Sequence, residues 1–498
     1  MEILKPFILK DFDIKKPFSS FLPGLAGVKG IPLWTYYTNR GQGIMSVGSK
    51  DKNGSIIEFN PACIGYEKVS TQGFRTFIKI DGKLIEVFGV RNNNSNIKRN
   101  MYITGASFKI EEINEDVGYK IEVNYFGLPN MSIGALVRRV KLTSLKNQTI
   151  EIVDGTSQVL PQGVSNGAYK DVGNLMRSWM DVYYMEEKTP FFTMRASSAD
   201  EAEVEEVVAG NFYLAKENNK LLNVICDLEL IFGYDSSRTH PINLINNKFS
   251  DILKQPQYVV NKIPCAFVGL EKHLKENEAV EIDSLLGYLP KYELLQNTLK
   301  DILEKDFFKN KEIEALTLIK ELTDDVKTET SYPLFDEYIR QSYLDNFLRG
   351  GYPVNLGDEN NVIPYYIFSR KHGDPERDYN WFNLEPEYYS QGNGNFRDVN
   401  QNRRSDVIFN SFIKDTNIKQ FMNLIALDGY NPLVINGSTF TLKATIDKEY
   451  LSKEILGEVN NKFIELLSSE FTPGGLINFF VKQNLNPLKS GEEIFKVV

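Results

Sequence analysis

The sequence has 498 residues, 42% of them hydrophobic and 25% charged, which is the balance of a globular protein with enough apolar side chains for roughly two to four domains. The net charge of −9 and the pI near 5.3 provide no basic surface, so nucleic acid and anionic membranes are not expected partners. The sequence opens without a signal-peptide-like apolar run and contains no run of membrane-spanning length, which predicts a soluble, cytoplasmic protein.

Cysteine and histidine are too few and too scattered for a disulfide framework or a metal cluster. We therefore expect no metal, no cofactor and no histidine-based catalytic triad. The positions concerned are Cys63, Cys226, Cys265, His240, His273 and His372.

Residues 1–290 show the short alternating runs that are typical of β-strands. Apolar and polar residues alternate over 119–125, and the Asp81–Gly82 pair after Ile80 favours a tight hairpin. Similar runs recur at 135–143, 148–154, 212–215 and 266–270. Many strands joined by polar loops predict a large antiparallel β-sandwich domain over this region rather than an alternating α/β fold.

The segment Gly43–Lys50 imitates a nucleotide-binding motif. Its glycines have the spacing of a phosphate-binding loop, but Ser49 precedes Lys50, which reverses the Walker order. It also lacks the preceding hydrophobic strand and the following helix that would direct backbone amides at a phosphate. We interpret it as a glycine-rich hairpin.

At residue 291 the hydrophobic period changes to that of a helix. Apolar residues within Leu295–Leu303 share one helical face, those within Ile313–Ile319 continue a second helix, and we expect Lys309–Lys311 to be the break between them. Residues 291–332 are therefore predicted to form a helical linker. Another helix is expected from Pro333 to Gly350–Gly351, where glycine supplies the C-terminal stop.

The central stretch Ser369–Asp406 combines charged, aromatic and amide residues with neither strand alternation nor helical spacing, so we expect irregular backbone that lies over a site. Flat aromatic faces beside planar polar groups suit a sugar ring, which has an apolar face and a rim of hydroxyls. The alternative is a buried ion-pair network that joins two helices. The aromatic residues are Tyr379, Trp381, Phe382, Tyr388, Tyr389 and Phe396, and the polar ones are Arg370, Arg377, Arg397, Asn393, Asn395 and Gln401.

Beyond this stretch the pattern predicts three amphipathic helices, at 407–427, 448–467 and 475–482. Between the first two, 430–442 resembles a polar insertion with a short strand, and the last residues, 491–498, carry no helix stop signal. We thus expect about four helices after residue 333, fewer than a closed barrel of paired helices contains.

The run Gly392–Gln401, GNGNFRDVNQ, resembles the Gly-Phe-Arg-Asp-x-Asn-Gln segment of the inverting β-glucoside phosphorylases typified by cellobiose phosphorylase. Together, SRKHGDPERDYN and YYSQGNGNFRDVNQNRR are more similar still to the related oligoglucan phosphorylases, which act on β-1,2- or β-1,3-linked gluco-oligosaccharides. The resemblance implies an N-terminal β-sandwich, a helical linker and an (α/α)6 barrel, of which residues 333–498 would be the first part. It also implies reversible phosphorolysis to α-glucose 1-phosphate with inversion, inorganic phosphate as co-substrate and a homodimer.

The resemblance carries over to individual residues where the motif matches. Arg397 and Asp398 match the Arg-Asp pair that hydrogen-bonds the glucosyl unit on the non-reducing side of the cleaved bond, where charge-assisted bonds can strengthen as positive charge develops on the sugar. Asn400 and Gln401 match the amides that follow the pair and would support it.

One position departs from the motif. Cellobiose phosphorylase has a further sugar-binding Arg four positions before the Phe, whereas this sequence has Gly392 there, so Arg370 or Arg377 would have to supply the missing hydrogen bond. Asn395 and Trp381 complete the expected substrate-binding set, Trp381 either as a platform on which a sugar stacks or as a core residue, and the same two alternatives stand for the neighbouring Phe382.

Phosphorolysis needs one protein acid, because phosphate is already an anion and requires no general base. The resemblance implies that this acid is an Asp two positions after a Trp, well past the Arg-Asp pair. The tryptophans are Trp34, Trp179 and Trp381, so none follows Asp398, and we expect no catalytic acid in this sequence. The chain is therefore interpreted as the N-terminal part of a phosphorylase that acts as a homodimer or needs a complementing C-terminal chain.

Two other functions stay open. Carboxylates of the central stretch, Asp374, Glu376 and Asp378, could include an acid and make the protein an inverting β-glucan hydrolase, although their spacing around an arginine favours ion pairs. Asp428 favours a turn rather than catalysis. The third possibility is a non-catalytic carbohydrate-binding or assembly subunit, which would need no acid.

Overall fold

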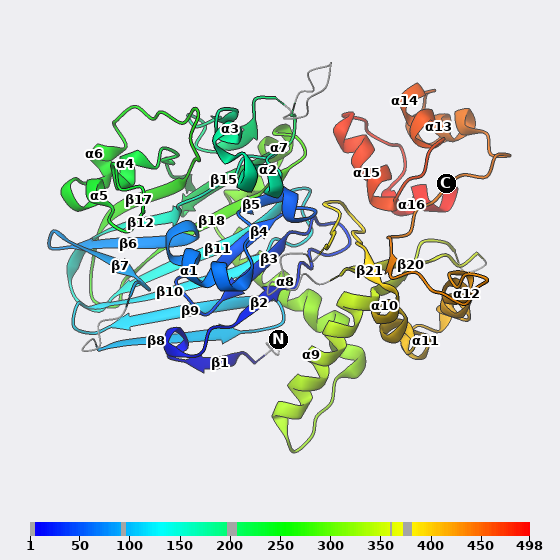
Figure 1. Ribbon diagram of the computed structural model, residues 1–498, viewed down its shortest axis with the longest axis horizontal. Coiled ribbons are helices and arrows are strands. Elements are labelled where there is room, and N and C mark those ends of the chain that lie inside the picture. Colours follow the sequence, from blue (N-terminus) through cyan, green and yellow to red (C-terminus); the bar gives the residue numbers. More distant parts are fainter. Residues whose placement is uncertain (1–4, 91–95, 197–206, 359–360, 372–380) are drawn as a thin grey trace.

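The computed structural model describes residues 5–90, 96–196, 207–358, 361–371 and 381–498 (Figure 1). It confirms a mixed α and β architecture in which large antiparallel sheets precede a region of helices. None of the helices in these ranges is long and apolar enough to cross a membrane.

Two sheets form the body of the N-terminal part. Among the described residues the larger has ten strands, ordered β1-β8-β9-β10-β11-β18-β15-β14-β13 with β16 beside β15, and the second is ordered β17-β12-β6-β7. The bounds in the larger sheet are β1 Phe7–Lys10, β8 Ile97–Ile103, β9 Ser107–Asn114, β10 Tyr119–Gly127, β11 Gly134–Ser144, β13 Met180–Tyr183, β14 Phe191–Met194, β15 Gly210–Glu217, β16 Lys220–Leu221 and β18 Ala279–Leu289. Those in the second sheet are β6 Phe74–Ile80, β7 Lys83–Val87, β12 Gln148–Thr156 and β17 Ala266–Leu274.

The two sheets pack face to face as a sandwich, because the alternation of side chains sends one apolar set of each strand inward. Tyr125 of β10 and Phe74 of β6 meet in this core with ring centroids 5.8 Å apart. The larger sheet is apolar on its other face as well: Leu286 of β18 belongs to the sandwich core, whereas Leu285 packs with helices outside it. Both faces of that sheet are therefore covered.

A buried charge network lies inside the sandwich. The side chain of Arg138 on β11 donates to both carboxylate oxygens of Asp154 on β12, at 3.2 and 2.6 Å, and also to Tyr125, to Gln42 at 2.5 Å and to Thr76 at 2.9 Å. All these residues are almost completely buried, and the Thr76 hydroxyl donates to Asp154 at 2.6 Å. The arginine and the aspartate thus have their hydrogen-bonding partners supplied by the protein.

A third sheet is ordered β2-β3-β4-β5, with bounds β2 Ser19–Leu22, β3 Trp34–Thr38, β4 Ile44–Gly48 and β5 Ser55–Ile57. The Gly43–Lys50 segment is mostly strand β4, paired antiparallel with β3 and β5, so the hairpin interpretation is confirmed. The Asp81–Gly82 hairpin is confirmed too, since it joins β6 to β7 and both residues have positive φ.

Short helices decorate the sandwich and its loops (Figure 1). Their bounds are α1 Ala62–Gln72, α2 Asn166–Asp171, α3 Gly173–Arg177, α4 Glu229–Phe232, α5 Ile242–Asn246 and α6 Phe249–Ile252, with 3-10 turns η1 Phe12–Ile14 and η2 Lys52–Gly54.

The next two helices, α7 Glu293–Ile302 and α8 Phe307–Thr323, pack on the outer face of the larger sheet and end at η3 Asp324–Val326. The predicted break at Lys309–Lys311 was wrong, because α8 runs through it and the chain bends instead at 303–306. Phe307 and Phe308 explain the shift: both are buried in the core between helix and sheet, so the helix begins at Phe307 and holds both side chains in that core.

Helix α9, Pro333–Gly350, ends as predicted, with Gly351 at φ 93. The hairpin β19 Tyr352–Asn355 and β20 Pro364–Ile367 follows. The central stretch was predicted to be irregular, which is wrong for its last third, where helix α10 occupies Phe396–Arg403. The prediction missed this helix because its buried stripe includes an arginine in place of a third apolar residue.

The predicted helices at 407–427 and 448–467 are each divided. The first becomes α11 Asp406–Phe409, η4 Ser411–Ile413 and α12 Thr416–Asn423, and the second becomes α13 Lys448–Leu456 and α14 Asn461–Leu466 around Gly457 at φ 79. The expected short strand is β22 Val434–Ile435, which pairs with β21 Gly394–Asn395. Helices α13, α14, α15 Pro473–Lys482 and α16 Gly491–Val497 share one apolar core.

Candidate functional site

Helix α10 presents the matched motif residues at its N-terminal end. Phe396, Val399 and Arg403 recur at the spacing of one helical face and are buried, which fixes the helix against its neighbours. Asn395 is the N-cap residue, and Asp398 lies in the first turn, where a carboxylate is favoured by the helix dipole. Arg397, Asn400 and Gln401 are consequently left on the exposed side.

Arg397, Asp398 and Asn395 form a hydrogen-bonded group, which we call the α10 cluster. The Nε of Arg397 donates to Oδ1 of Asp398 at 3.3 Å, and Nδ2 of Asn395 donates to Oδ2 at 3.1 Å. The guanidinium side chain is 79% exposed and the carboxylate side chain 24% exposed. Both carboxylate oxygens are thus held in place while the donors of Arg397 still face solvent.

Arg403 anchors the same helix from the inside. Its Nε donates to the carbonyl of Gly350 at 2.5 Å, its Nη1 donates to Gln420 at 3.2 Å, and its guanidinium carbon lies 3.6 Å from the ring centre of Tyr366. Burial lowers the pKa of this arginine to about 10. Arg403 therefore ties α10 to the end of α9 and to β20.

A pocket of about 400 Å³ opens beside the C-terminal half of α10. We call it the α9–α10 pocket, because α9, α10, β19 and α11 supply its walls. Its residues are Tyr343, Asn346, Phe347, Gly351, Tyr352, Pro353, Gln401, Asn402, Arg404, Ser405, Asp406 and Phe409. Aromatic faces beside amides and a carboxyl group give the lining an apolar and a hydrogen-bonding component, which is the combination that a sugar needs.

Asp406 is the chemically distinctive member of this pocket. Its Oδ2 is buried and has no hydrogen-bond partner among the residues that the structure describes. Burial raises the pKa of Asp406 to about 7, an effect that the hydroxyl of Tyr366 and the charge of Arg403 only partly oppose. Near neutral pH this carboxyl group can thus either donate or accept a hydrogen bond from a ligand.

The α10 cluster and the α9–α10 pocket are contiguous through the helix itself. Gln401 and Asn402 lie three and four residues after Asp398, and Ser405 lies four and three residues after them, so these residues follow one another along one side of the helix and its extension. The Nδ2 of Asn402 also donates to the backbone carbonyl of Asp398 at 2.7 Å. A ligand of several sugar units could contact both. Asn400, exposed like Arg397, lies two residues from Asp398 and does not share its side of the helix.

Arg370 lies elsewhere, buried between the sandwich and the helical region. Its guanidinium carbon is 5.8 Å from the ring centre of Phe21, and it lines a small cavity of about 20 Å³ with Trp34 and Phe382. Burial lowers its pKa to about 10. The structure thus places Arg370 apart from the exposed motif residues, and its sugar-binding role stays a prediction.

The absence of an arginine at position 392 has a steric explanation. A Cβ on Gly392 would lie 1.8 Å from the carbonyl oxygen of Asn383, so no side chain fits there without moving the backbone. The same Cβ would lie 3.3 Å from Cβ of Arg370, which places Arg370 next to the position where the motif has its further arginine. Arg377, the other expected substitute, lies outside the described residues, as do His372, Asp374, Glu376, Asp378 and Tyr379.

Trp381 and Phe382 were both predicted to be either stacking platforms or core residues. Phe382 is a core residue and Trp381 is not. Phe382 packs edge-on against Trp34 and Tyr36, with ring centroids 5.6 and 5.9 Å apart. Trp381 is 65% exposed, and Nζ of Lys52 lies 4.5 Å from its ring centre. A flat indole face at the surface is available for stacking on a sugar.

Sequence reasoning missed Asp406 and Arg403 as individual candidates. The available signal was a change of pattern at the end of the central stretch, where two arginines are followed by an aspartate and the apolar run Val407–Phe409. That pattern is common at ordinary helix starts, so only the three-dimensional structure distinguishes the unpartnered carboxyl group from a helix cap.

No protein-family model matches the sequence, and no curated protein matches it. Among solved structures the chain is similar to a bacterial glucoamylase complexed with acarbose, with a TM-score of 0.36 and 12% identity over 86% of this chain and 55% of that one. It is also similar to a protein described as "Putative kojibiose phosphorylase from human microbiome", with a TM-score of 0.24 and 10% identity over 68% and 32%.

A third similar structure is a heparinase III, with a TM-score of 0.24 and 7% identity over 55% of this chain and 36% of that one. The chain thus spans about half the length of the glucoamylase and a third of that of the phosphorylase. Similarities at these TM-scores do not define the family to which the chain belongs.

Proposed function

We propose that this protein is the N-terminal part of an inverting glycoside phosphorylase that converts β-linked gluco-oligosaccharides and inorganic phosphate into α-glucose 1-phosphate. The observation that carries the proposal is the α10 cluster, in which Arg397 and Asp398 stand hydrogen-bonded and accessible at a helix start beside an aromatic pocket. These are the two residues that the motif resemblance assigns to the glucosyl unit.

In this proposal Asp398 and Arg397 grip the hydroxyls of the glucosyl ring. A carboxylate fixed by Asn395 and Arg397 loses little orientational freedom when a hydroxyl donates to it, so more of the interaction energy remains available for the transition state. Phosphate attacks the anomeric carbon from the opposite face, while a carboxylic acid protonates the departing oxygen. We assign that acid to polypeptide that completes the helical domain.

Exposed apolar side chains support the need for such polypeptide. On α11 and α12, Ile408 is 75% exposed, Ile418 69% and Met422 62%, and the following loop leaves Leu427 fully accessible. Apolar side chains that cluster on neighbouring elements usually become buried against a partner. We propose that further helices of an (α/α)6 barrel cover this surface, and that the finished enzyme is a homodimer or needs a complementing C-terminal chain.

The first test is sugar binding. Isothermal titration calorimetry with β-1,2- and β-1,3-linked glucose disaccharides should show binding to the wild-type chain that Asp398→Asn weakens by about tenfold or more, because one charged hydrogen bond contributes on the order of 1.5–3 kcal/mol. Asp428→Asn is the matched control, since this aspartate caps a turn through the amide of Tyr430 at 3.1 Å. Equal binding by wild type and Asp398→Asn would remove the basis of the proposal.

The second test is product analysis with the complementing polypeptide present. Release of glucose 1-phosphate that depends on added phosphate supports the phosphorylase. Phosphate-independent release of glucose would instead favour an inverting β-glucan hydrolase, for which Asp406, with its raised pKa and its oxygen unpartnered among the described residues, is the candidate acid. Binding without any turnover would identify a carbohydrate-binding subunit.

A further inference from the structure

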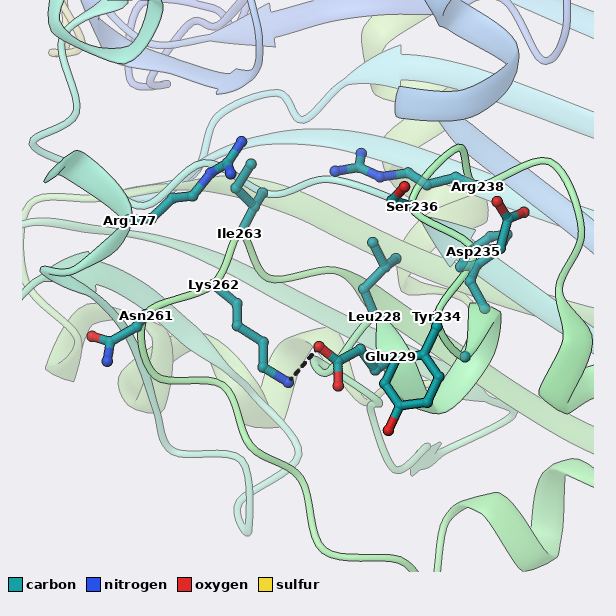
Figure 2. Close-up of a pocket in the computed structure, with 12 residues that line it drawn as sticks. Arg177, Leu228, Glu229, Tyr234, Asp235, Ser236, Arg238, Asn261, Lys262 and Ile263 are labelled. Atoms are coloured by element: carbon teal, nitrogen blue, oxygen red, sulfur yellow. Dashed lines mark ion pairs between the residues drawn. The ribbon is translucent and has the colours of Figure 1, made fainter. Parts of the chain in front are cut away.

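A second pocket of about 410 Å³ lies among the helices and loops beside the sandwich, far along the sequence from α10. It is bounded by the end of α3, by α4 and the turn after it, and by residues 261–263 (Figure 2). We call it the sandwich pocket. The residues on which its chemistry depends are Arg177, Arg238, Lys262, Tyr234, Phe232 and Ile263.

Two arginines face this pocket. Figure 2 shows the guanidinium groups of Arg177 and Arg238 extending toward each other from opposite walls. Their side chains make long hydrogen bonds: Arg177 donates to Asn174 at 3.5 Å, and Arg238 donates to the carbonyl of Ser157 at 3.4 Å. Within the part of the chain that the structure describes, neither forms an ion pair with Asp or Glu, so donors of both remain available to a ligand.

The other charged groups of the pocket are already occupied. Lys262 forms ion pairs with Asp227 at 3.1 Å and with Glu229 at 3.3 Å, the second of which is drawn in Figure 2. The carboxylate of Asp235 accepts hydrogen bonds from the hydroxyl of Ser237 at 2.5 Å and from the amide of His240 at 2.7 Å. The local excess of positive charge therefore comes from the two arginines.

The turn after α4 holds Arg238 in position. Its φ is 58, in the left-handed region that side chains other than glycine seldom adopt, and the Asp235 hydrogen bonds close the turn on both sides of it. The backbone carbonyl of Arg238 also accepts a hydrogen bond from Arg75, whose own charge is paired with Glu86. These contacts fix the backbone from which the Arg238 side chain extends toward the pocket.

Electrostatics favour an anion between the two groups. Burial lowers the pKa of Arg238; the neighbouring Tyr169 and Cys265 oppose this shift, and the positive charges of Arg177 and Arg75 add to it. An anion that contacts both guanidinium groups would relieve this repulsion and replace the lost hydration. The planar forks of arginine match the oxygens of a phosphate, to which they can donate two parallel hydrogen bonds each.

We propose that the sandwich pocket binds a phosphate group, carried by a small molecule or as free phosphate, between Arg177 and Arg238. The floor is apolar, with Phe232 and Ile263 buried, and the phenol ring of Tyr234 is 96% exposed at the rim. These surfaces suit the sugar ring of a phosphorylated hexose, whose phosphate would lie between the arginines. This site is independent of the proposed function of the α10 cluster.

Titration calorimetry in a low-chloride buffer tests the proposal with two probes, inorganic phosphate and glucose 6-phosphate. Binding should weaken by about tenfold or more in Arg177→Gln and in Arg238→Gln, because each loses charged hydrogen bonds. Arg177 lies at the end of a short helix and is exposed, so Arg177→Gln remains informative if Arg238→Gln disturbs its turn. Lys254→Gln is the control: it removes a positive charge from the same half of the sandwich, where Lys254 pairs with Asp251 at 2.8 Å.

The outcomes separate the two sources of phosphate. Tighter binding of glucose 6-phosphate that Tyr234→Ala weakens supports a phosphorylated sugar, whereas equal affinity for both probes supports phosphate itself. Phosphate binding that survives in Asp398→Asn keeps this site distinct from the α10 cluster. Failure of both probes to bind at about 10 mM, or unchanged binding in Arg177→Gln and Arg238→Gln, would overturn the proposal.

Discussion

The sandwich and the helical region each contain an aspartate near an arginine, and the two pairs are built differently: Asp154 is fully buried, whereas Asp406 is half-buried with one buried oxygen. In the sandwich, Asp154 accepts hydrogen bonds at both oxygens from Arg138, and both residues are almost completely buried. In the helical region, Arg403 directs its donors to Gly350 and Gln420, and Oδ2 of Asp406, at the wall of a pocket, finds no partner within the described ranges.

This difference distinguishes polar groups that stabilise the fold from polar groups that can bind a ligand. A network whose members satisfy one another has nothing to offer a ligand, and it specifies how two sheets face each other. A carboxyl group with one buried, vacant acceptor has lost hydration that its neighbours replace only in part, and a ligand or further polypeptide can supply the missing hydrogen bond. The exposed apolar side chains of α11 and α12 belong to the same helical region as Asp406.

The largest expected effect is on the stability of the sandwich, through the Asp154–Arg138 pair. Asp154→Asn should lower the free energy of unfolding by about 3–5 kcal/mol, because it leaves the charge of Arg138 buried without its counterion. Urea denaturation followed by circular dichroism measures the change. A loss below about 1 kcal/mol would mean that water or rearranged side chains compensate the charge of the arginine. The network would then not depend on Asp154 as the partner of Arg138.

The next effect is the pH dependence of the free energy of unfolding that the carboxyl group of Asp406 causes. Burial raises the pKa of Asp406 from 3.8 to about 7, so the folded protein binds more protons than the unfolded chain between these values. Its contribution to stability is therefore complete below the unfolded pKa and is lost as pH rises through the folded pKa. Between pH 5 and pH 8 the wild type should lose on the order of 2–3 kcal/mol more than Asp406→Asn.

Comparing the two proteins at each pH isolates this group. Glu387, whose pKa burial also raises to about 7, titrates in the same window but is present in both proteins and cancels. Urea midpoints at several pH values provide the measurement. A wild-type minus variant difference that stays constant from pH 5 to pH 8 would show that Asp406 is ionised throughout and is compensated in the folded state.

Elements with local sequence signals could be predicted from the sequence, and elements that depend on distant contacts could not. Alternation over 119–125 and the Asp81–Gly82 pair are local signals, and the strands and hairpin that they predict are present. The break between α7 and α8 was misplaced because the burial of Phe307 and Phe308 depends on a sheet formed by residues far away in sequence. Local periodicity carries no information about such a distant partner.

At the site, the motif identified candidate residues but did not show which of them lie together in the fold. The motif drew attention to Arg397 and Asp398, which the structure brings together with Asn395, but it also suggested Arg370, which the structure buries beside Phe21. Arg370 and Arg397 are indistinguishable by composition. What separates them is packing against β-strands from the first 40 residues, and that follows only from the assembled fold.

A third prediction applies the same chemical change to the exposed cluster. Asp398→Asn should lower the free energy of unfolding by only about 1 kcal/mol, because the carboxylate contributes a favourable interaction with the helix dipole and a solvent-exposed ion pair. Thermal or urea unfolding beside Asp154→Asn gives the comparison directly. A loss above about 2 kcal/mol would make Asp398 a structural residue and would weaken its assignment to sugar binding.

The smallest effect tests whether Trp381 is held at the surface. Lys52 lies 4.5 Å from its ring centre, and such a cation–π contact at an exposed site contributes about 0.5 kcal/mol. A double-mutant cycle with Lys52→Met and Trp381→Leu should therefore give a coupling of that size, which isolates the pair from the contact of Lys52 with Phe59 at 6.0 Å. Zero coupling would mean that Trp381 is not positioned by this lysine. A coupling above about 2 kcal/mol would mean that the pair is desolvated, so the indole face would be unavailable to a sugar.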